Sequence, residues 1–205
     1  MKNNTINNTL SDQCDSIIAA RSLLQHPFYQ SWSEGRLPVE ALRDYAREYG
    51  AFIDTIAAGW RAALEPRIAS IEEGHAELWR STFAASLETE VHTPAIPEAA
   101  SLVNTAEKLF STHSTALGAL YAFEAQQPQT AERKLKGLRE HYVQLPASCG
   151  DYFEQHLGDY DEPAHLAEKL NALPPVAHDE ALRACDAMCD ALYEALSGIH
   201  APHAC

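Results

Sequence analysis

The segment from Ala119 to Leu138 constrains the fold most, because it joins strong helix formers to an apolar surface too wide for an exposed helix. Its sequence, ALYAFEAQQPQTAERKLKGL, predicts two helices that meet near Pro128. Leu120 and Phe123 belong to the wide apolar stripe, so this segment is expected to be central. Glu124 interrupts the stripe. A carboxylate in a core is costly unless it is paired or binds a metal. Other residues of the chain are therefore expected to supply a partner for Glu124 or to bind a metal with it.

The length and charge of the chain limit both its organisation and its partners. A chain of 205 residues fits one domain, and we expect a flexible N-terminus at residues 1–10, a helical domain at 11–197 and a flexible tail at 198–205. The net charge of -14 argues against nucleic acid and anionic membranes as partners. No apolar run is long enough to span a membrane, and the polar N-terminus does not look like a signal peptide. We therefore expect a cytoplasmic protein with reduced cysteines.

The hydrophobic pattern predicts helices along the whole domain. Strand signals are absent, because the chain has no alternating β-branched runs and no Asn-Gly or Asp-Gly turns. Residues 26–32 read as a short apolar turn. The predicted helices cover residues 12–24, 39–64, 67–87, 98–110, 114–126, 129–143, 147–157, 164–173 and 176–196. The expected fold class is all-α, a bundle of about seven or eight helices.

Glutamate and histidine residues at helical spacing indicate a metal site. Glu72 and His75 are three residues apart, so they share one face of a helix. Carboxylate-rich helical bundles use this Glu-x-x-His spacing to hold one metal of a pair. Glu162 and His165 repeat the spacing, and Asp161 lies four residues before the same histidine. One such pair arises often by chance, so neither pair alone establishes a site.

The combination with the core glutamate strengthens the metal hypothesis. Glu124 and His156 bring the set to three carboxylates and three imidazoles, with either Asp161 or Glu162 as the third carboxylate. Mixed oxygen and nitrogen ligands suit two iron or manganese ions. The residues alone do not decide between the two acidic candidates or between the two metals.

Four stretches of the chain resemble a known family. They are HPFYQSWSEGRLPVEALRDYAREY at residues 26–49, EEGHAELW at 72–79, ALYAFEAQQPQTAERKLKGL at 119–138 and YFEQH at 152–156. Together they resemble the CADD-like proteins, which are heme-oxygenase-like di-metal oxidases related in fold to the TenA and PqqC proteins. The resemblance implies a bundle of about seven helices that binds no heme. It also implies two transition-metal ions, iron and/or manganese, that activate dioxygen with the help of a reductant.

The resemblance also implies an unusual activity. CADD-like members supply para-aminobenzoate for folate biosynthesis by consuming one of their own tyrosines, with a lysine as the source of nitrogen. The tyrosine matches Tyr29, the lysine matches Lys134, and Tyr152 matches a tyrosine near the metals. Without the resemblance, Tyr29 would be a packing aromatic and Lys134 a solvated lysine.

The implied ligand set departs from the family pattern. It consists of Glu72, His75, Glu124, His156 and His165. The spacer between the first glutamate and histidine is shorter than is usual in the family. Eight residues separate the last two histidines, which on one unbroken helix would place them on opposite sides. Gly158 and Pro163 must therefore break the helix, or the second metal site is damaged. Phe123 also stands where the family often has a tyrosine.

Two alternatives to this activity stay open. The protein could be a heme-oxygenase-like di-iron oxidase that acts on a separate small substrate. It could also be a metal-poor protein of the same fold that binds a ligand or a partner. A homodimer is one possible assembly.

Overall fold

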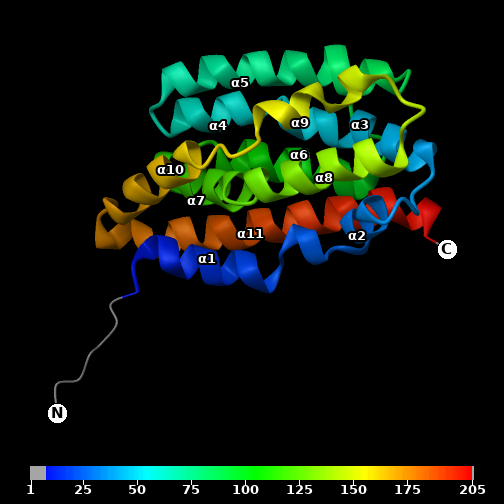
Figure 1. Ribbon diagram of the computed structural model, residues 1–205. Coiled ribbons are helices and arrows are strands. Elements are labelled where there is room, and N and C mark those ends of the chain that lie inside the picture. The colour runs from blue at the N-terminus through cyan, green and yellow to red at the C-terminus, as the bar shows by residue number, and fades with distance from the viewer. Residues whose placement is uncertain (1–7, 205) are drawn as a thin grey trace.

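The computed structural model describes residues 8–204, and in this range the chain is helical without any β-strand (Figure 1). The expected all-α fold is therefore confirmed. Most of the segment expected to be a flexible N-terminus, residues 1–7, lies outside the described residues, as does Cys205. None of the helices in the described range has the length and hydropathy needed to cross a membrane.

The helices follow the predicted order, with boundaries that differ at several places. In chain order they are α1 (Leu10–Ala20), α2 (Pro27–Ser33), α3 (Val39–Ile53), α4 (Ile56–Ala62), α5 (Pro66–Leu78), α6 (Pro97–Leu109), α7 (His113–Glu124), α8 (Gln127–His141), α9 (Asp151–Gln155), α10 (Asp161–Asn171) and α11 (Pro175–His200). Short single-turn segments lie between them, including η1 (Leu23–Gln25) and η3 (Ala147–Gly150).

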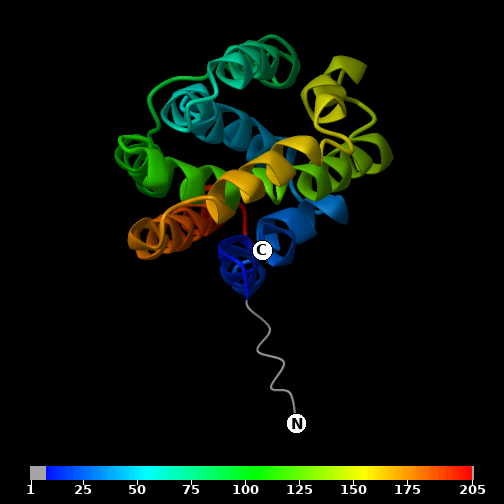
Figure 2. The ribbon, with the colours of Figure 1, turned by 90° about the vertical axis from the view of Figure 1, so that its left-hand side faces the viewer.

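Helix α7 lies at the centre of the bundle, as its apolar composition predicts. All of its residues from Ala116 to Glu124 are buried, so it has no face for solvent. It packs against α11, α10 and α4. In Figures 1 and 2, α4 and α5 lie on one side of the bundle, and α1, α2 and α11 lie on the other. A Cβ atom at Gly118 would lie 2.1 Å from the backbone oxygen of Ala181, so only glycine permits this approach of α7 to α11.

Three segments differ from their predicted form. Residues 26–32 are not a turn but mostly helix α2, because Pro27 suits the first helical position and the His26 side chain caps the helix by accepting a hydrogen bond from the Phe28 N–H. The predicted helix 39–64 is broken between α3 and α4 at residues 54–55. The predicted helix 67–87 continues beyond α5 as a π-helical segment, η2 (Trp79–Ala84).

Helix α11 continues to His200, beyond the predicted end at residue 196. A final turn, η4 (Ala201–His203), follows it. The His203 side chain lies 2.8 Å from the Asp44 carboxylate of α3, so this turn is attached to the bundle.

The predicted break between His156 and His165 is confirmed. Helix α9 ends at Gln155, α10 begins at Asp161, and Gly158 adopts a φ of +70°, which favours glycine. Pro163 does not cause the break, because it lies in the first turn of α10, where the missing N–H costs nothing.

Candidate metal centre

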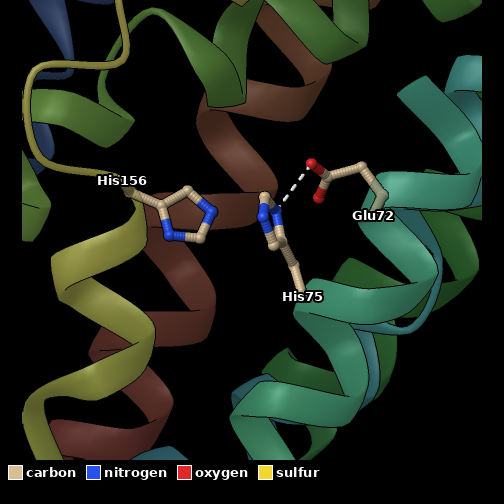
Figure 3. Close-up of side chains that lie close together, drawn as sticks. All are labelled: Glu72, His75 and His156. Atoms are coloured by element: carbon tan, nitrogen blue, oxygen red, sulfur yellow. Dashed lines mark hydrogen bonds and ion pairs between the residues drawn. The ribbon is translucent and has the colours of Figure 1, made fainter. Parts of the chain in front are cut away.

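Three predicted ligands form one cluster between α5 and the end of α9. One ligand atom each from Glu72, His75 and His156 lies within 4.8 Å of the other two. Figure 3 shows the two imidazole rings side by side, with their centroids 4.6 Å apart, and the Glu72 carboxylate bonded to His75. The spacing of three residues in α5 produces this bond, as the helix period predicts.

The hydrogen bonds of both histidines leave one ring nitrogen free to bind a metal. His156 Nδ1 lies 2.8 Å from the Tyr152 carbonyl oxygen, which can only accept, so Nδ1 carries the proton and Nε2 keeps its lone pair. His75 Nδ1 lies 2.9 Å from Glu72 Oε1; burial opposes the charged form of His75, but this bond raises its pKa overall, so Nε2 can bind a metal once its proton has left. Burial lowers the pKa of His156 to about 4, so this imidazole is neutral at neutral pH. Metal-binding histidines are commonly oriented by such bonds to a carbonyl or a carboxylate.

Further carboxyl groups surround the cluster. Glu124 is the last residue of α7 and accepts a hydrogen bond from Trp60 Nε1 at 3.2 Å. Burial and the neighbouring Glu72 and Glu162 raise the pKa of Glu124 well above its usual value. Burial, Glu72 and Asp159 also raise the pKa of Glu162, to about 8.

This crowding of carboxyl groups fits a bound cation. In residues 8–204, neither lysine nor arginine forms an ion pair with Glu72, Glu124 or Glu162. Buried carboxylates that lack a positive partner repel one another, and a divalent metal ion relieves this repulsion. Mixed carboxylate and imidazole donors suit iron and manganese. The residues present therefore fit the metal that the sequence predicts.

The structure distinguishes the two acidic candidates and adds a third. Glu162 is partly buried and acts on the pKa of Glu124, whereas Asp161 is exposed. This geometry favours Glu162. Asp159 contributes to the raised pKa of Glu124 and of Glu162, yet no motif singled it out, because it lies in the loop between α9 and α10.

His165 lies apart from this cluster. Its Nε2 is 2.9 Å from Glu65 Oε1, and Lys169 forms an ion pair with the same carboxylate. The expectation that the break after His156 brings both histidines to one cluster is therefore wrong. The spacing of three residues puts His165 near the helix face of Glu162. The His165 side chain nevertheless bonds to Glu65, which lies 100 positions earlier in the chain.

A second group of predicted residues lies in the core between α2, α3 and α8. The Tyr29 and Tyr45 hydroxyl oxygens are 3.0 Å apart, and Lys134 Nζ donates to the Tyr45 hydroxyl at 3.3 Å. The Lys134 amine also lies 5.3 Å from the centre of the Tyr29 ring. The two residues that the family resemblance singles out are thus joined through Tyr45, which no sequence motif indicated.

Lys134 is buried and has no acidic partner. Its exposed fraction is 4%, so the alternative that it is a solvated lysine is wrong. In the described part of the chain it forms no ion pair with a carboxylate, and aromatic rings surround it. Burial lowers its pKa to about 7, so the neutral amine is accessible at neutral pH.

Tyr152 lies between the two groups. Its ring centroid is 4.5 Å from that of His156, and burial followed by the nearby Glu72 raises the pKa of its phenol. Tyr29 also contributes to this raised pKa. Tyr152 thus lies beside His156, one of the predicted ligands.

Comparison with known proteins agrees with this geometry. The model of a family of iron-containing redox enzymes matches residues 39–196. The chain belongs to this family. A 4-aminobenzoate synthase of Nitrosomonas europaea is 32% identical, over 94% of this chain and 92% of the relative. A 4-aminobenzoate synthase of Chlamydia muridarum is 29% identical, over 95% of this chain and 91% of the relative.

Solved structures share the fold of this iron-containing redox enzyme. A TenA homologue from Pseudomonas syringae superposes with a TM-score of 0.73 at 17% identity, covering 93% of this chain and 90% of that one. A CADD-like protein of unknown function from Nostoc punctiforme superposes with a TM-score of 0.68 at 20% identity, covering 95% of this chain and 94% of that one. The predicted heme-oxygenase-like, TenA-related fold is thereby confirmed.

The depressed pKa of Lys134 leads to a measurable titration. In protein with 13C at the lysine Cε positions, one resonance is expected to titrate near pH 7, and Lys134→Met should remove it. In the unfolded chain this lysine has a pKa of about 10.4. Between about pH 7 and that value, the unfolded chain holds a proton that the folded protein has lost, so the free energy of unfolding rises with pH. Lys134→Met should therefore raise the melting temperature at pH 7. A wild-type spectrum in which every lysine titrates above pH 9 would contradict the assignment.

Proposed function

We propose that this protein is a self-consuming 4-aminobenzoate synthase, which makes para-aminobenzoate for folate biosynthesis from its own Tyr29 with nitrogen from Lys134. The observation that carries this proposal is the hydrogen-bonded and buried group of Tyr29, Tyr45 and Lys134. A buried lysine without an acidic partner is costly, and a need for a neutral amine explains why it is there. The names of the two relatives support the same activity.

The candidate centre would hold two transition-metal ions, iron and/or manganese. The proposed ligands are Glu72, His75, Glu124, His156 and Glu162, while His165 is bonded to Glu65. When bound, the metals would supply the redox chemistry that reduces dioxygen with electrons from an external reductant. No heme is required.

The side chains around Tyr29 prepare it for oxidation. The Tyr45 hydroxyl fixes the phenol orientation, and the buried rings of Phe28 and Trp32 keep water away from it. Burial raises the pKa of the Tyr29 phenol, so it stays protonated until it is oxidised. Burial lowers the pKa of the Lys134 amine to about 7, and this amine lies 5.3 Å from the centre of the Tyr29 ring that it would attack after oxidation.

A direct experiment separates this function from its alternatives. The gene should restore growth of a strain that requires para-aminobenzoate, and purified protein made with ring-labelled tyrosine should release labelled product. An oxidase of a separate substrate would release unlabelled product, and a metal-poor binding protein would release none. Either result would overturn the proposal. The homodimer and the cytoplasmic location remain predictions.

A further inference from the structure

Helix α2, which carries Tyr29, has only seven residues. An isolated helix of this length is not stable in water, so contacts at its ends decide where it lies and where it holds Tyr29. Figure 1 shows α2 beside the C-terminal part of α11, with which it is in contact. A buried histidine, His26, stands at the junction of the two helices, and 2% of it is exposed. The proposed reaction assigns no role to this residue.

The hydrogen bonds of His26 fix its tautomer. The Phe28 N–H can only donate, so His26 Nδ1, at 3.0 Å, accepts and carries no proton. The Ser197 hydroxyl donates to the Tyr193 carbonyl oxygen at 3.1 Å, so its oxygen accepts from His26 Nε2 at 3.0 Å. His26 therefore has the neutral Nε2–H form. Burial, followed by the nearby His200, lowers the pKa of His26 to about 4, so this form persists at neutral pH.

One imidazole thus joins two helices. Its Nδ1 caps α2, its Nε2 binds α11 through Ser197, and its ring packs edge-on against Tyr193 with 4.4 Å between the centroids. An asparagine side chain would also cap α2, but it ends at the position of Nδ1 and does not reach Ser197 as the imidazole does. Histidine at this position therefore supplies a link to α11 that an ordinary cap does not.

The other end of α2 is attached to α8. His141 Nε2 lies 3.1 Å from the Ser33 carbonyl oxygen, which accepts its proton. Tyr29 lies between the two attachments, with its hydroxyl 3.0 Å from that of Tyr45. Loss of the attachment at the start of α2 would therefore let the Tyr29 phenol move relative to Tyr45 and to the Lys134 amine.

We propose that His26 is a positioning residue that fastens α2 to α11 through Ser197 and thereby holds the Tyr29 phenol in its reactive position. This inference rests on the proposed function. Within residues 8–204, the hydrogen bonds and ring contacts of His26 include neither the Tyr29 side chain nor a candidate metal ligand, so it acts through the backbone of α2. A misplacement of about 1 Å can slow an enzymatic reaction about a hundredfold, so the attachment affects the rate even where the fold survives.

Two substitutions separate the cap from the link to α11. His26→Asn keeps an acceptor for the Phe28 N–H, because asparagine is a favoured N-cap residue, but it loses the bond to Ser197. Ser197→Ala removes the same bond from the other side and leaves the imidazole in place. Because both changes remove one shared interaction, the double variant should behave like either single variant.

Thr9→Ala is the matched control. Thr9 caps α1 by accepting a hydrogen bond from the Asp12 N–H at 3.2 Å, so this variant also loses an N-cap bond, but in a helix that does not carry Tyr29. It therefore reports what a general loss of helix stability does to the reaction.

The first readout is the rate at which Tyr29 is consumed. Peptide mass mapping follows it in folded protein of equal metal content, with dioxygen and reductant supplied. His26→Asn, Ser197→Ala and the double variant should each consume Tyr29 at least about tenfold more slowly than the wild type, and Thr9→Ala should keep the wild-type rate. The wild-type rate in either His26→Asn or Ser197→Ala would overturn the proposal. Equal slowing in Thr9→Ala would also overturn it.

The second readout does not depend on the reaction. The full chain is loaded with zinc, which is diamagnetic and has no redox chemistry, and carries 13C at tyrosine Cζ and 15N in histidine. Magnetic resonance should show the Nε2–H tautomer for His26. The Tyr29 resonance, assigned with Tyr29→Phe, should shift in Ser197→Ala but not in Thr9→Ala.

The outcomes of this second readout separate the positioning role from the proposed function. A His26 ring with its proton on Nδ1, or a Tyr29 resonance that Ser197→Ala leaves unchanged, would overturn the positioning role. A wild type that shows the expected signals but does not consume Tyr29 would overturn the proposed function and leave His26 as the residue that positions Tyr29.

Discussion

Replacing Tyr29 by phenylalanine is expected to abolish 4-aminobenzoate formation while the protein keeps its fold and its metals. The change removes one hydroxyl and its bond to Tyr45, which costs about 0.5–1.5 kcal/mol of stability. Without the phenol, the ring is too hard to oxidise. The measurement is product per chain by mass spectrometry, with dioxygen and reductant supplied. The wild type should make at most one product molecule per chain, because each turnover consumes Tyr29.

Tyr142→Phe is the matched control for this experiment. Tyr142 is also buried, and its hydroxyl donates one hydrogen bond, to the backbone oxygen of Leu37 at 3.0 Å. The two variants therefore lose the same atoms and a comparable bond. Tyr142→Phe should form product as the wild type does. Equal product from both variants would remove Tyr29 from the reaction.

Lys134→Arg should also form no product, because a guanidinium stays protonated and cannot act as an amine nucleophile. An arginine at this buried position could unfold the protein, so Lys134→Met serves as the second variant, with a side chain of similar length and no charge. Lys169→Arg is the control, since its amine pairs with Glu65 outside the aromatic group. Product with unlabelled nitrogen from protein made with 15N-lysine would contradict the role of Lys134.

Glu124→Ala is expected to lose metal, from two ions per chain to one or none. Glu124 is the most deeply buried of these carboxyl groups, and burial followed by the nearby Glu72 and Glu162 raises its pKa, so it is the one that most needs a cation. Replacement of only an outer hydrogen-bond partner of a ligand typically weakens metal affinity about 10- to 100-fold, and loss of a ligand itself should cost at least as much. Elemental analysis after loading with iron, manganese or both measures the effect.

Glu65→Ala is the control for the metal experiment. Glu65 is also a carboxylate bonded to a histidine, but it lies with His165 and Lys169 outside the cluster. It should keep the full metal content. Full metal retention in Glu124→Ala would exclude that residue as a ligand. His165→Ala tests the remaining candidate, and we expect it to retain metal because the structure places His165 on Glu65.

The helical order and the central position of α7 could be predicted because both depend on local information. A helix forms its hydrogen bonds within a few residues, and the apolar residues around Phe123 leave no polar face for solvent. The same locality explains why Glu72 and His75 were predicted to meet. The break after His156 was also predictable, since Gly158 adopts a backbone conformation that few other residues tolerate.

Helix boundaries were less predictable where packing decides them. The break between α3 and α4 has neither glycine nor proline at residues 54–55. The π-helical segment from Trp79 to Ala84 contains neither glycine nor proline. At both places the residues also suit a regular α-helix. Local helix propensity therefore does not distinguish a regular helix from an interrupted or π-helical one.

The sequence by itself determined an all-α chain in which Glu72 and His75 share a helix face, and the family resemblance marked Tyr29, Lys134 and Tyr152. Only the tertiary structure decided which of these residues meet. It joined Tyr29 to Lys134 through Tyr45, and it paired His165 with Glu65 instead of the metal cluster. These partners lie on different helices, and their distance depends on how the helices cross. Helical period fixes a side chain's direction on its own helix, but burial against other helices fixes its neighbours.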